Sequence, residues 1–379
     1  MQLFEVIRSI LTLSFVLAAT LSVKTARADD MAMANSALAG ASDTKHIGTA
    51  ESPSGCNDVN GGEMAMMNSC LMPFGIMTGE AGKWMVGYQF MHDKMDGSLV
   101  GTDDINVSQI LKQFPNAPTD MTMDTHMGMV MYAPTQKLTL TAMVPYVLKE
   151  MNNVNADGSR FVERTSGVGD VELGGSYQIF QTSNVRHQLL LSGGMALPTG
   201  AIDKKMDGFQ LEYCMQPGSG TVALLPGVTY LGQTAAWSWG ADFHTTARLG
   251  RNDHNYRFGN IYQSRTWVMR QLGSWLSVSA GLNGVICETI HGADPDLDPS
   301  MEQTADSNLQ AGKRLDASFG LTFCPMPCCH GRPPCCSAAR TFLDGQQVFV
   351  EGRLPIIQSL DGPQLQNSWS INVGWQWMF

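Results

Sequence analysis

Sulfur-bearing side chains are the residues that most directly suggest chemistry in this 379-residue sequence, which has 25 methionines and 9 cysteines. Thioethers and thiolates bind soft ions such as Cu(I). Methionine is concentrated in two stretches, 61–77 and 121–131, and the metal-ligand candidates of the first stretch are Met64, Met66, Met67 and Cys70. Copper binding by the Met- and Cys-rich segments is therefore one hypothesis, with copper as its only cofactor.

The spacing of the second stretch indicates a β-strand. In MTMDTHMGMVMY (121–132) all five methionines occupy odd positions, and the polar residues Thr122, Asp124 and His126 occupy even positions. Side chains alternate across a strand, so the pattern predicts one apolar and one polar face. Membrane barrels direct apolar residues to lipid and polar residues inward. We therefore expect the methionines to face lipid; a soft-metal site would require them to face the lumen.

Five cysteines form a block that also contains His330: Cys324, Cys328, Cys329, Cys335 and Cys336. Their C-x3-C-C spacing differs from the C-x2-C pairs of a zinc ribbon. Disulfides are the expected state of cysteines in an oxidising compartment. We expect them among Cys56, Cys70, Cys324, Cys328, Cys329, Cys335 and Cys336. Cys56 with Cys70 is one candidate pair, and metal binding by the block is the alternative.

The N-terminus indicates export. An apolar run at 10–23 precedes Ala26-Arg27-Ala28, a cleavage-site pattern, so residues 1–28 are interpreted as a signal peptide. The run is too short for a membrane-spanning helix, which needs about 20 residues. Residues 29–80 are rich in Met, Gly and Ser, and we expect a flexible segment that can plug a barrel. The net charge of −10 argues against nucleic acid as a partner.

Two-residue alternation from Lys83 onwards indicates an all-β protein. It predicts strands near 83–93, 121–132, 137–149, 170–179, 187–197, 220–230, 235–249, 256–270, 275–288, 314–323, 348–358 and 368–379. Short links (133–136, 181–186, 231–234, 271–274) alternate with long ones (94–120, 150–166, 198–219, 250–255, 289–313, 359–367). This predicts a transmembrane antiparallel up-and-down β-barrel of about 12 strands over 81–379, with 324–347 as a Cys-rich periplasmic turn.

The last strand predicts where the barrel is placed. Its apolar face ends in Trp375, Trp377 and Phe379 and resembles the assembly signal of outer-membrane barrels. We therefore expect a location in the outer membrane of a Gram-negative bacterium. The expected partners are outer-membrane lipid, the barrel-assembly machinery and a small-molecule solute.

Ionisable residues on the polar strand faces are candidates for lining the lumen: Asp170, Glu172, Asp242, His244, Arg248, Arg314, Asp316, Glu351 and Arg353. They form either an internal salt-bridge network or a charged constriction that selects solutes. Catalysis is not expected, because the sequence has no G-x-S-x-G stretch and His244 shares the polar face with Ser238.

Four motifs resemble one family of outer-membrane proteins, grouped under a phenol meta-pathway degradation label and often called transporters. They are GKWMVGYQFMHDKMDGSLVGTDDI (82–105), SGVGDVELGGSY (166–177), ALPTG (196–200) and the C-terminal stretch 354–379. The resemblance covers about 72–379 and implies an outer-membrane barrel linked to aromatic degradation or to metal resistance. It brings no catalytic residues, and the Cys-rich block lies outside the family's pattern.

We therefore expect an outer-membrane channel for small solutes, with aromatic or apolar compounds as the class that the resemblance suggests. The alternative is a copper- or heavy-metal-linked envelope protein.

Overall fold

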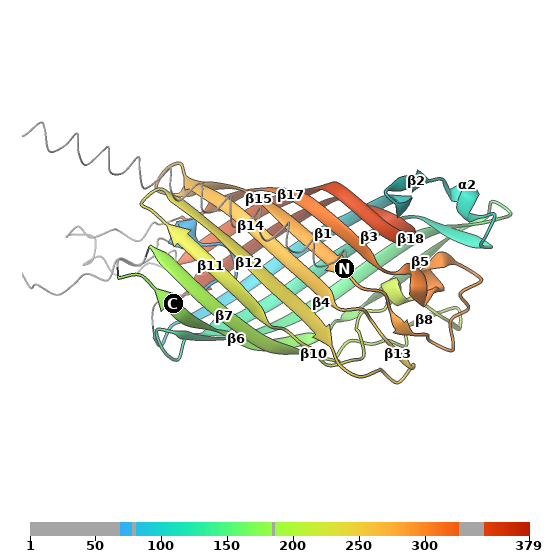
Figure 1. Cartoon of the computed structure of the whole chain (residues 1–379), viewed down its shortest axis with the longest axis horizontal. Helices are drawn as coiled ribbons and strands as arrows, with labels where there is room; N and C mark the ends of the chain where they lie inside the picture. Colours follow the sequence, from blue (N-terminus) through green and yellow to red (C-terminus); the bar gives the residue numbers. More distant parts are fainter. Residues whose placement is uncertain (1–68, 78–80, 184–185, 326–344) are drawn as a thin grey trace, which may run out of the picture. The chain divides into compact units, whose positions relative to one another are not determined.

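A computed structural model describes residues 69–77, 81–183, 186–325 and 345–379, and β-strands make up most of them (Figure 1). The elements are, in sequence order, η1 (Ser69–Leu71), β1 (Trp84–Gly101), β2 (Asp103–Ile105), α2 (Val107–Ile110), β3 (Asn116–Tyr132), β4 (Leu138–Asn155), β5 (Arg160–Val168), β6 (Val171–Gln181), β7 (His187–Leu197), β8 (Lys205–Met206), β9 (Phe209–Gln210), η2 (Tyr213–Met215), β10 (Ala223–Leu224), β11 (Gly227–Gln233), β12 (Trp237–Arg248), β13 (Tyr256–Arg257), β14 (Ile261–Gln271), β15 (Leu276–Cys287), β16 (His291–Gly292), η3 (Gln303–Ala305), η4 (Ser307–Leu309), β17 (Gly312–Phe323) and β18 (Gln346–Met378). No helix among these elements is long and apolar enough to cross a membrane.

The strands close into an antiparallel barrel. The hydrogen-bonded order is β12, β11, β7, β6, β4, β3, β1, β18, β17, β15 and β14, and β14 pairs back with β12. The long strand β18 crosses the barrel wall twice. Residues Val348–Leu360 pair with β17, and Leu360–Met378 pair with β1. Contacts between Gln347 and Gln376 join the two halves. The described ring therefore makes about 12 passes, in agreement with the all-β barrel predicted from the sequence.

Most predicted strands match, and several links are shorter than predicted. The predicted link 150–166 is largely strand, because β4 continues to Asn155 and β5 begins at Arg160. The predicted link 359–367 lies within β18. The predicted strand 220–230 is interrupted between β10 and β11, where Pro226 has no N–H to donate to a neighbouring strand. The predicted strand 256–270 begins only at Ile261, apart from the short β13.

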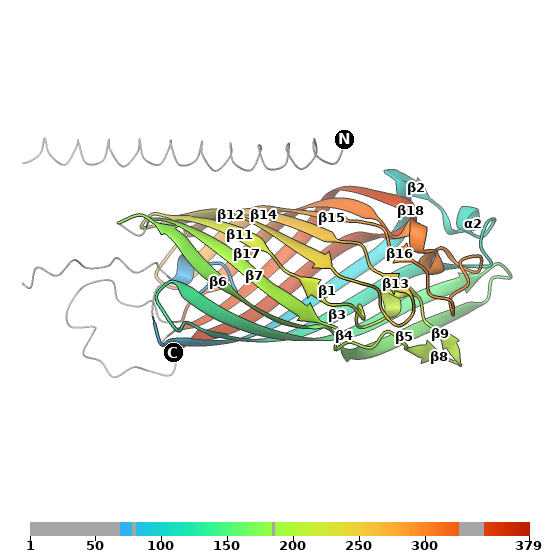
Figure 2. The ribbon, with the colours of Figure 1, turned by 60° about the horizontal axis from the view of Figure 1, so that its bottom comes forward.

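The two ends of the barrel differ. One end carries the C-terminus and short strand connections, such as 133–137 and 272–275. The opposite end carries β2, α2, β5, β8, β9, β13 and β16 (Figure 2). Outer-membrane barrels have short periplasmic turns and longer extracellular loops. We therefore refer to the first as the periplasmic end and to the second as the outer end.

The methionine face of β3 points inward, which corrects the expectation that it meets lipid. Met121, Met129 and Met131 are at most 7% exposed, whereas Val130 is 43% exposed. Two polar residues of the opposite face, Asp124 and His126, have partners on the outer surface of β1. His92 Nδ1 lies 2.5 Å from Asp124 Oδ1, and the hydroxyl of Tyr88 lies 2.6 Å from His126 Nδ1. The rule that polar side chains face the lumen therefore predicted the wrong orientation for this strand.

Candidate functional site

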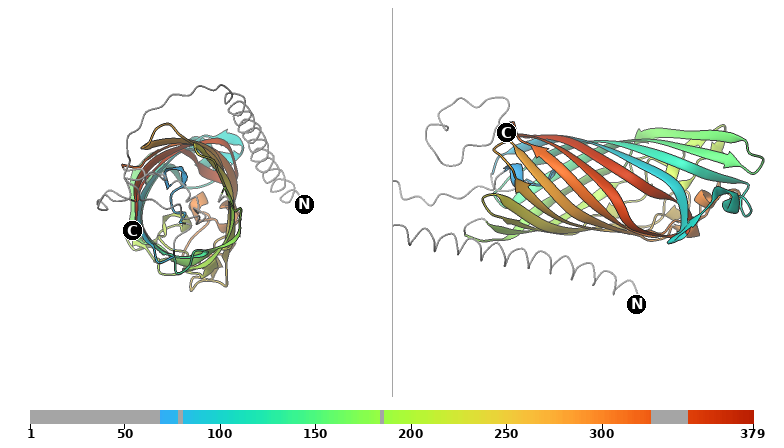
Figure 3. Two further views of the ribbon diagram at one scale, coloured as in Figure 1. Left: turned by 90° about the vertical axis from the view of Figure 1, so that its left-hand side faces the viewer. Right: turned by 90° about the horizontal axis from the view of Figure 1, so that it is seen from above.

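The segment Ser69–Met77, which we call the strap, lies within the ring of strands (Figure 3, left). Its backbone carbonyls accept hydrogen bonds from three strands: Ser238 Oγ of β12 donates to Leu71 O at 2.6 Å, Gln347 Nε2 of β18 to Met72 O at 3.1 Å, and Thr139 Oγ1 of β4 to Met77 O at 3.3 Å. Each donor is the second residue of its strand. The strap therefore crosses the lumen at the periplasmic end.

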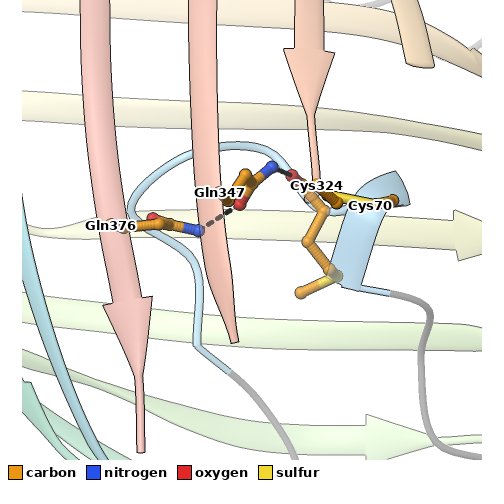
Figure 4. Close-up of a disulfide and its surroundings, with 5 residues drawn as sticks. Cys70, Cys324, Gln347 and Gln376 are labelled. Carbon is orange, nitrogen blue, oxygen red and sulfur yellow. Dashed lines mark hydrogen bonds between the residues drawn. A yellow bond between two sulfur atoms is a disulfide. The ribbon is translucent and has the colours of Figure 1, made fainter. Parts of the chain in front are cut away.

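A disulfide between Cys70 and Cys324 joins the strap to the barrel (Figure 4). Cys324 directly follows β17, and its backbone N–H donates to Trp275 O at 2.9 Å. Both cysteines are buried, at 0% and 2% exposure. Cys70 is thus paired with Cys324, not with the candidate partner Cys56. Cys56, Cys328, Cys329, Cys335 and Cys336 lie outside the described residues, as do Met64, Met66 and Met67.

Apolar side chains of the strap complete a packed core in this part of the lumen. Met77 packs with Met85, Met129 and Met131, and Phe74 joins the same cluster. Met72 packs separately against Leu190, Leu231 and Trp267. The rings of Phe74 and Phe349 lie 4.6 Å apart. The inward methionines therefore pack against the strap, and the strap and strand side chains together form a hydrophobic core inside this part of the lumen.

Next to the strap lies a cavity of about 450 Å³ with an apolar and a polar wall. Phe74, Ile76, Met129, Met131 and Met143 form the apolar wall. The polar wall contains Asp242, His244, Gln263, Arg265, Asn283 and Arg353, and Glu172 lines the cavity from β6. A smaller space of about 130 Å³ shares Phe74, Arg265 and Arg353 with it. The volume of the larger cavity lies in the range that suits small organic ligands.

The lumen-facing charges lie in short pairs. Arg265 Nε lies 3.4 Å from Asp242 Oδ2, and His244 Nε2 lies 3.8 Å from Asp242 Oδ1. Arg314 Nε donates to Asp316 Oδ2 at 3.0 Å, and Arg353 Nε donates to Glu351 Oε1 at 2.8 Å. These lumen candidates therefore form ion pairs, and the choice between an internal salt-bridge network and a charged constriction that selects solutes stays a prediction.

Two of the predicted lumen residues, Asp170 and Arg248, make their contacts with the outer loops instead. The carboxylate of Asp170 accepts hydrogen bonds from Gly200 N at 3.0 Å and from Ser219 Oγ at 2.5 Å. Arg248 Nη1 donates to Gly259 O, and its guanidinium lies 5.4 Å from the ring centre of Phe258. Both therefore anchor the loops that follow β7 and β12, and neither lines the cavity next to the strap.

Sequence reasoning missed Arg265, because the alternation of 256–270 is blurred by residues before Ile261 that lie outside β14. It also missed three buried carboxyl groups at the outer end, Glu163, Glu212 and Glu302. They belong to β5 and to two separate outer loops, so no spacing in the sequence connects them.

These three carboxyl groups contact one another beyond the membrane-spanning part of the strands. On β4 the apolar outward face ends at Leu148, and the next outward residue, Glu150, accepts a hydrogen bond from Arg164 Nε at 2.8 Å. Glu163 lies further out and accepts from Asn153 Nδ2 at 2.8 Å. Burial and the neighbouring Glu302 raise the pKa of Glu163 to about 7. Burial and a hydrogen bond with Glu302 raise the pKa of Glu212 well above its usual value.

Three solved structures of outer-membrane proteins align with this barrel. A structure of the COG4313 outer membrane channel from Pseudomonas putida F1 aligns with a TM-score of 0.51 and 12% identity, covering 85% of this chain and 100% of that one. A Pseudomonas aeruginosa FadL homologue aligns at a TM-score of 0.36 and 10% identity, covering 78% and 89%. The Pseudomonas putida toluene transporter TodX aligns at 0.34 and 10%, covering 79% and 89%. No curated protein matches the sequence.

The first of these likenesses shows a shared fold, that of an outer-membrane β-barrel, and the apolar outward strand faces suit a lipid environment. A family model matches residues 113–321, more than half of the sequence. This protein is a member of the family described as "Putative MetA-pathway of phenol degradation".

Proposed function

We propose that the protein is an outer-membrane channel for small apolar or aromatic solutes. The observation that carries the proposal is the cavity of about 450 Å³ inside the closed barrel, with its methionine- and phenylalanine-lined wall. Thioether sulfurs make favourable contacts with aromatic rings. The COG4313 protein, which shares the fold of this barrel, is called an outer membrane channel, and this supports the channel part of the proposal. Transport requires no catalysis, and we assign none to the lumen.

The strap is the gate in this proposal. It is fixed to the barrel at Cys70 and rejoins it at β1, so it obstructs the periplasmic end between two attachment points. The wider segment 29–80 would then act as the plug expected from the sequence. Passage requires the strap to shift within the lumen, because Met77 and Phe74 are packed against strand side chains.

Export and insertion complete the proposal. Residues 1–28 would be removed as a signal peptide, and the assembly machinery would recognise the final strand, which ends in Trp375, Trp377 and Phe379. The rings of Trp377 and Phe379 lie 4.6 Å apart. These two aromatic residues lie on the outward face that such machinery would contact.

Planar-bilayer conductance of the refolded mature protein tests the channel. We expect small or rare conductance steps for the complete mature protein and larger steps when residues 29–77 are deleted. A variant with Phe209→Ala, at an exposed outer-loop position, is the matched control and should behave as the parent. A passive channel would be ruled out if none of these proteins gave conductance steps while each showed the heat-modifiable mobility of a folded barrel.

A further inference from the structure

A corner of the lumen has hydrogen-bond donors without acceptors. Arg265 and Trp267 lie two residues apart on β14, and Asn283 pairs with Arg265 across the β14–β15 ladder. Arg265 Nε, Trp267 Nε1 and Asn283 Nδ2 are all buried and make no hydrogen bond with the described residues, although Arg265 Nε forms an ion pair with Asp242 Oδ2 at 3.4 Å. Buried donors are normally satisfied, and leaving one unpaired costs stability. Three such donors together therefore point to a group that supplies acceptors.

The corner borders both cavities. Arg265 and Asn283 line the larger one, and Arg265 and Trp267 line the smaller one. Arg353 lines both and donates its Nε to Glu351, so that its two terminal nitrogens are not used by that bond. Guanidinium groups present parallel N–H donors that match a planar carboxylate. The wall opposite is apolar, with Met129 and Phe74.

We propose that this corner binds the carboxylate of a small apolar acid, with the acid's hydrocarbon or aromatic body against the methionine wall. The inference rests on the proposed function, since it requires apolar solutes to enter the lumen, and it narrows their class to those with an acidic oxygen group. Asp242 competes with the ligand, because its Oδ2 lies 3.4 Å from Arg265 Nε.

Calorimetric titration of the full mature protein in detergent tests the corner. Benzoate is the probe, and toluene, similar in size but without acceptor oxygens, is the comparison ligand. We expect benzoate to bind at least about tenfold more tightly than toluene. Arg265→Met should lower the affinity for benzoate by about tenfold and leave the affinity for toluene unchanged. Arg164→Met, on the outer surface of β5, is the matched control and should change neither.

Two further variants separate ligand binding from a structural role. Asp242→Asn should tighten benzoate binding, because it frees Arg265, whereas a purely structural ion pair predicts no gain. Asn283→Asp keeps the side-chain size and should abolish benzoate binding through charge repulsion, even where Arg265→Met fails to fold. Equal affinities for benzoate and toluene, or an unchanged benzoate affinity in Asn283→Asp, would overturn the proposal.

The titration needs no conductance, so the two proposals can fail separately. Benzoate binding by a barrel that is silent in bilayers would leave the corner standing and remove the channel. Conductance by a barrel that binds benzoate and toluene equally well would support the channel and overturn the carboxylate site.

Discussion

At the scale of single residues, the buried carboxyl groups of the outer end give the structure its clearest expected pH dependence. Glu163 has a folded-state pKa of about 7, above its usual value of 4.5, so the folded state binds the proton more tightly than the unfolded state. The contribution of Glu163 to the free energy of unfolding should therefore be greatest below about pH 4.5, decrease as pH rises towards 7, and be absent above it. The full effect is on the order of 3 kcal/mol.

Hydrogen–deuterium exchange of the loops 198–222 and 288–311 measures this residue-scale effect. We expect slower exchange at pH 5 than at pH 8, after correction for the intrinsic exchange rate. Glu163→Gln should remove most of the difference. Glu150→Gln, on the same hairpin and on its outer surface, should retain it. A pH dependence unchanged in Glu163→Gln would show that other groups cause it.

The orientation of the methionines is a second residue-scale prediction. With the protein in vesicles, Val130→Cys should place a spin label in contact with lipid, because Val130 is 43% exposed on the outer face. Met129→Cys should place the same label in the packed lumen. A lipid-soluble relaxation agent should therefore broaden the signal of the first and not of the second. Equal broadening would contradict the inward assignment of Met129.

At the scale of elements, alternation predicted most strands well but not always which face they bury. On β3, polar residues face outward because partners on β1 satisfy them, as His92 does for Asp124. On β14, Trp267 faces inward because the strap residue Met72 packs against it. A lumen filled by part of its own sequence behaves as a core, and a rule that equates polar with inward then fails. The contacts of the strap could not be read from spacing, since the pairing of Cys70 with Cys324 spans 254 residues.

The strap itself gives the element-scale prediction. Replacing both Cys70 and Cys324 with serine should lengthen open times in bilayer recordings, because the strap keeps its hydrogen bonds but loses its covalent attachment. Added reductant should have little effect on the parent, since both sulfur atoms are buried. The free cysteines Cys214 and Cys287 supply a control, and replacing them with serine should not change gating. Identical open times in parent and Cys70→Ser/Cys324→Ser would remove the disulfide from the gating mechanism.

At the scale of the whole molecule, closure depends on pairing the first strand of the ring with the last. Trp84 N donates to Phe379 O at 3.1 Å, and Phe379 N donates to Trp84 O at 2.9 Å, so the C-terminal residue completes the seam. A closed barrel leaves no unpaired edge in lipid, where each unsatisfied backbone group is costly. Deleting Phe379 should therefore lower the yield of heat-modifiable barrel in refolding experiments.

Phe379→Ala separates the two contributions of that residue, because it keeps the backbone pairs and removes the ring beside Trp377. We expect Phe379→Ala to refold in detergent with nearly the parental yield, since the seam is intact. In cells it should still insert poorly, because the outward aromatic end that the assembly machinery would recognise is lost. Parental insertion in cells would show that seam pairing alone directs this barrel to its membrane.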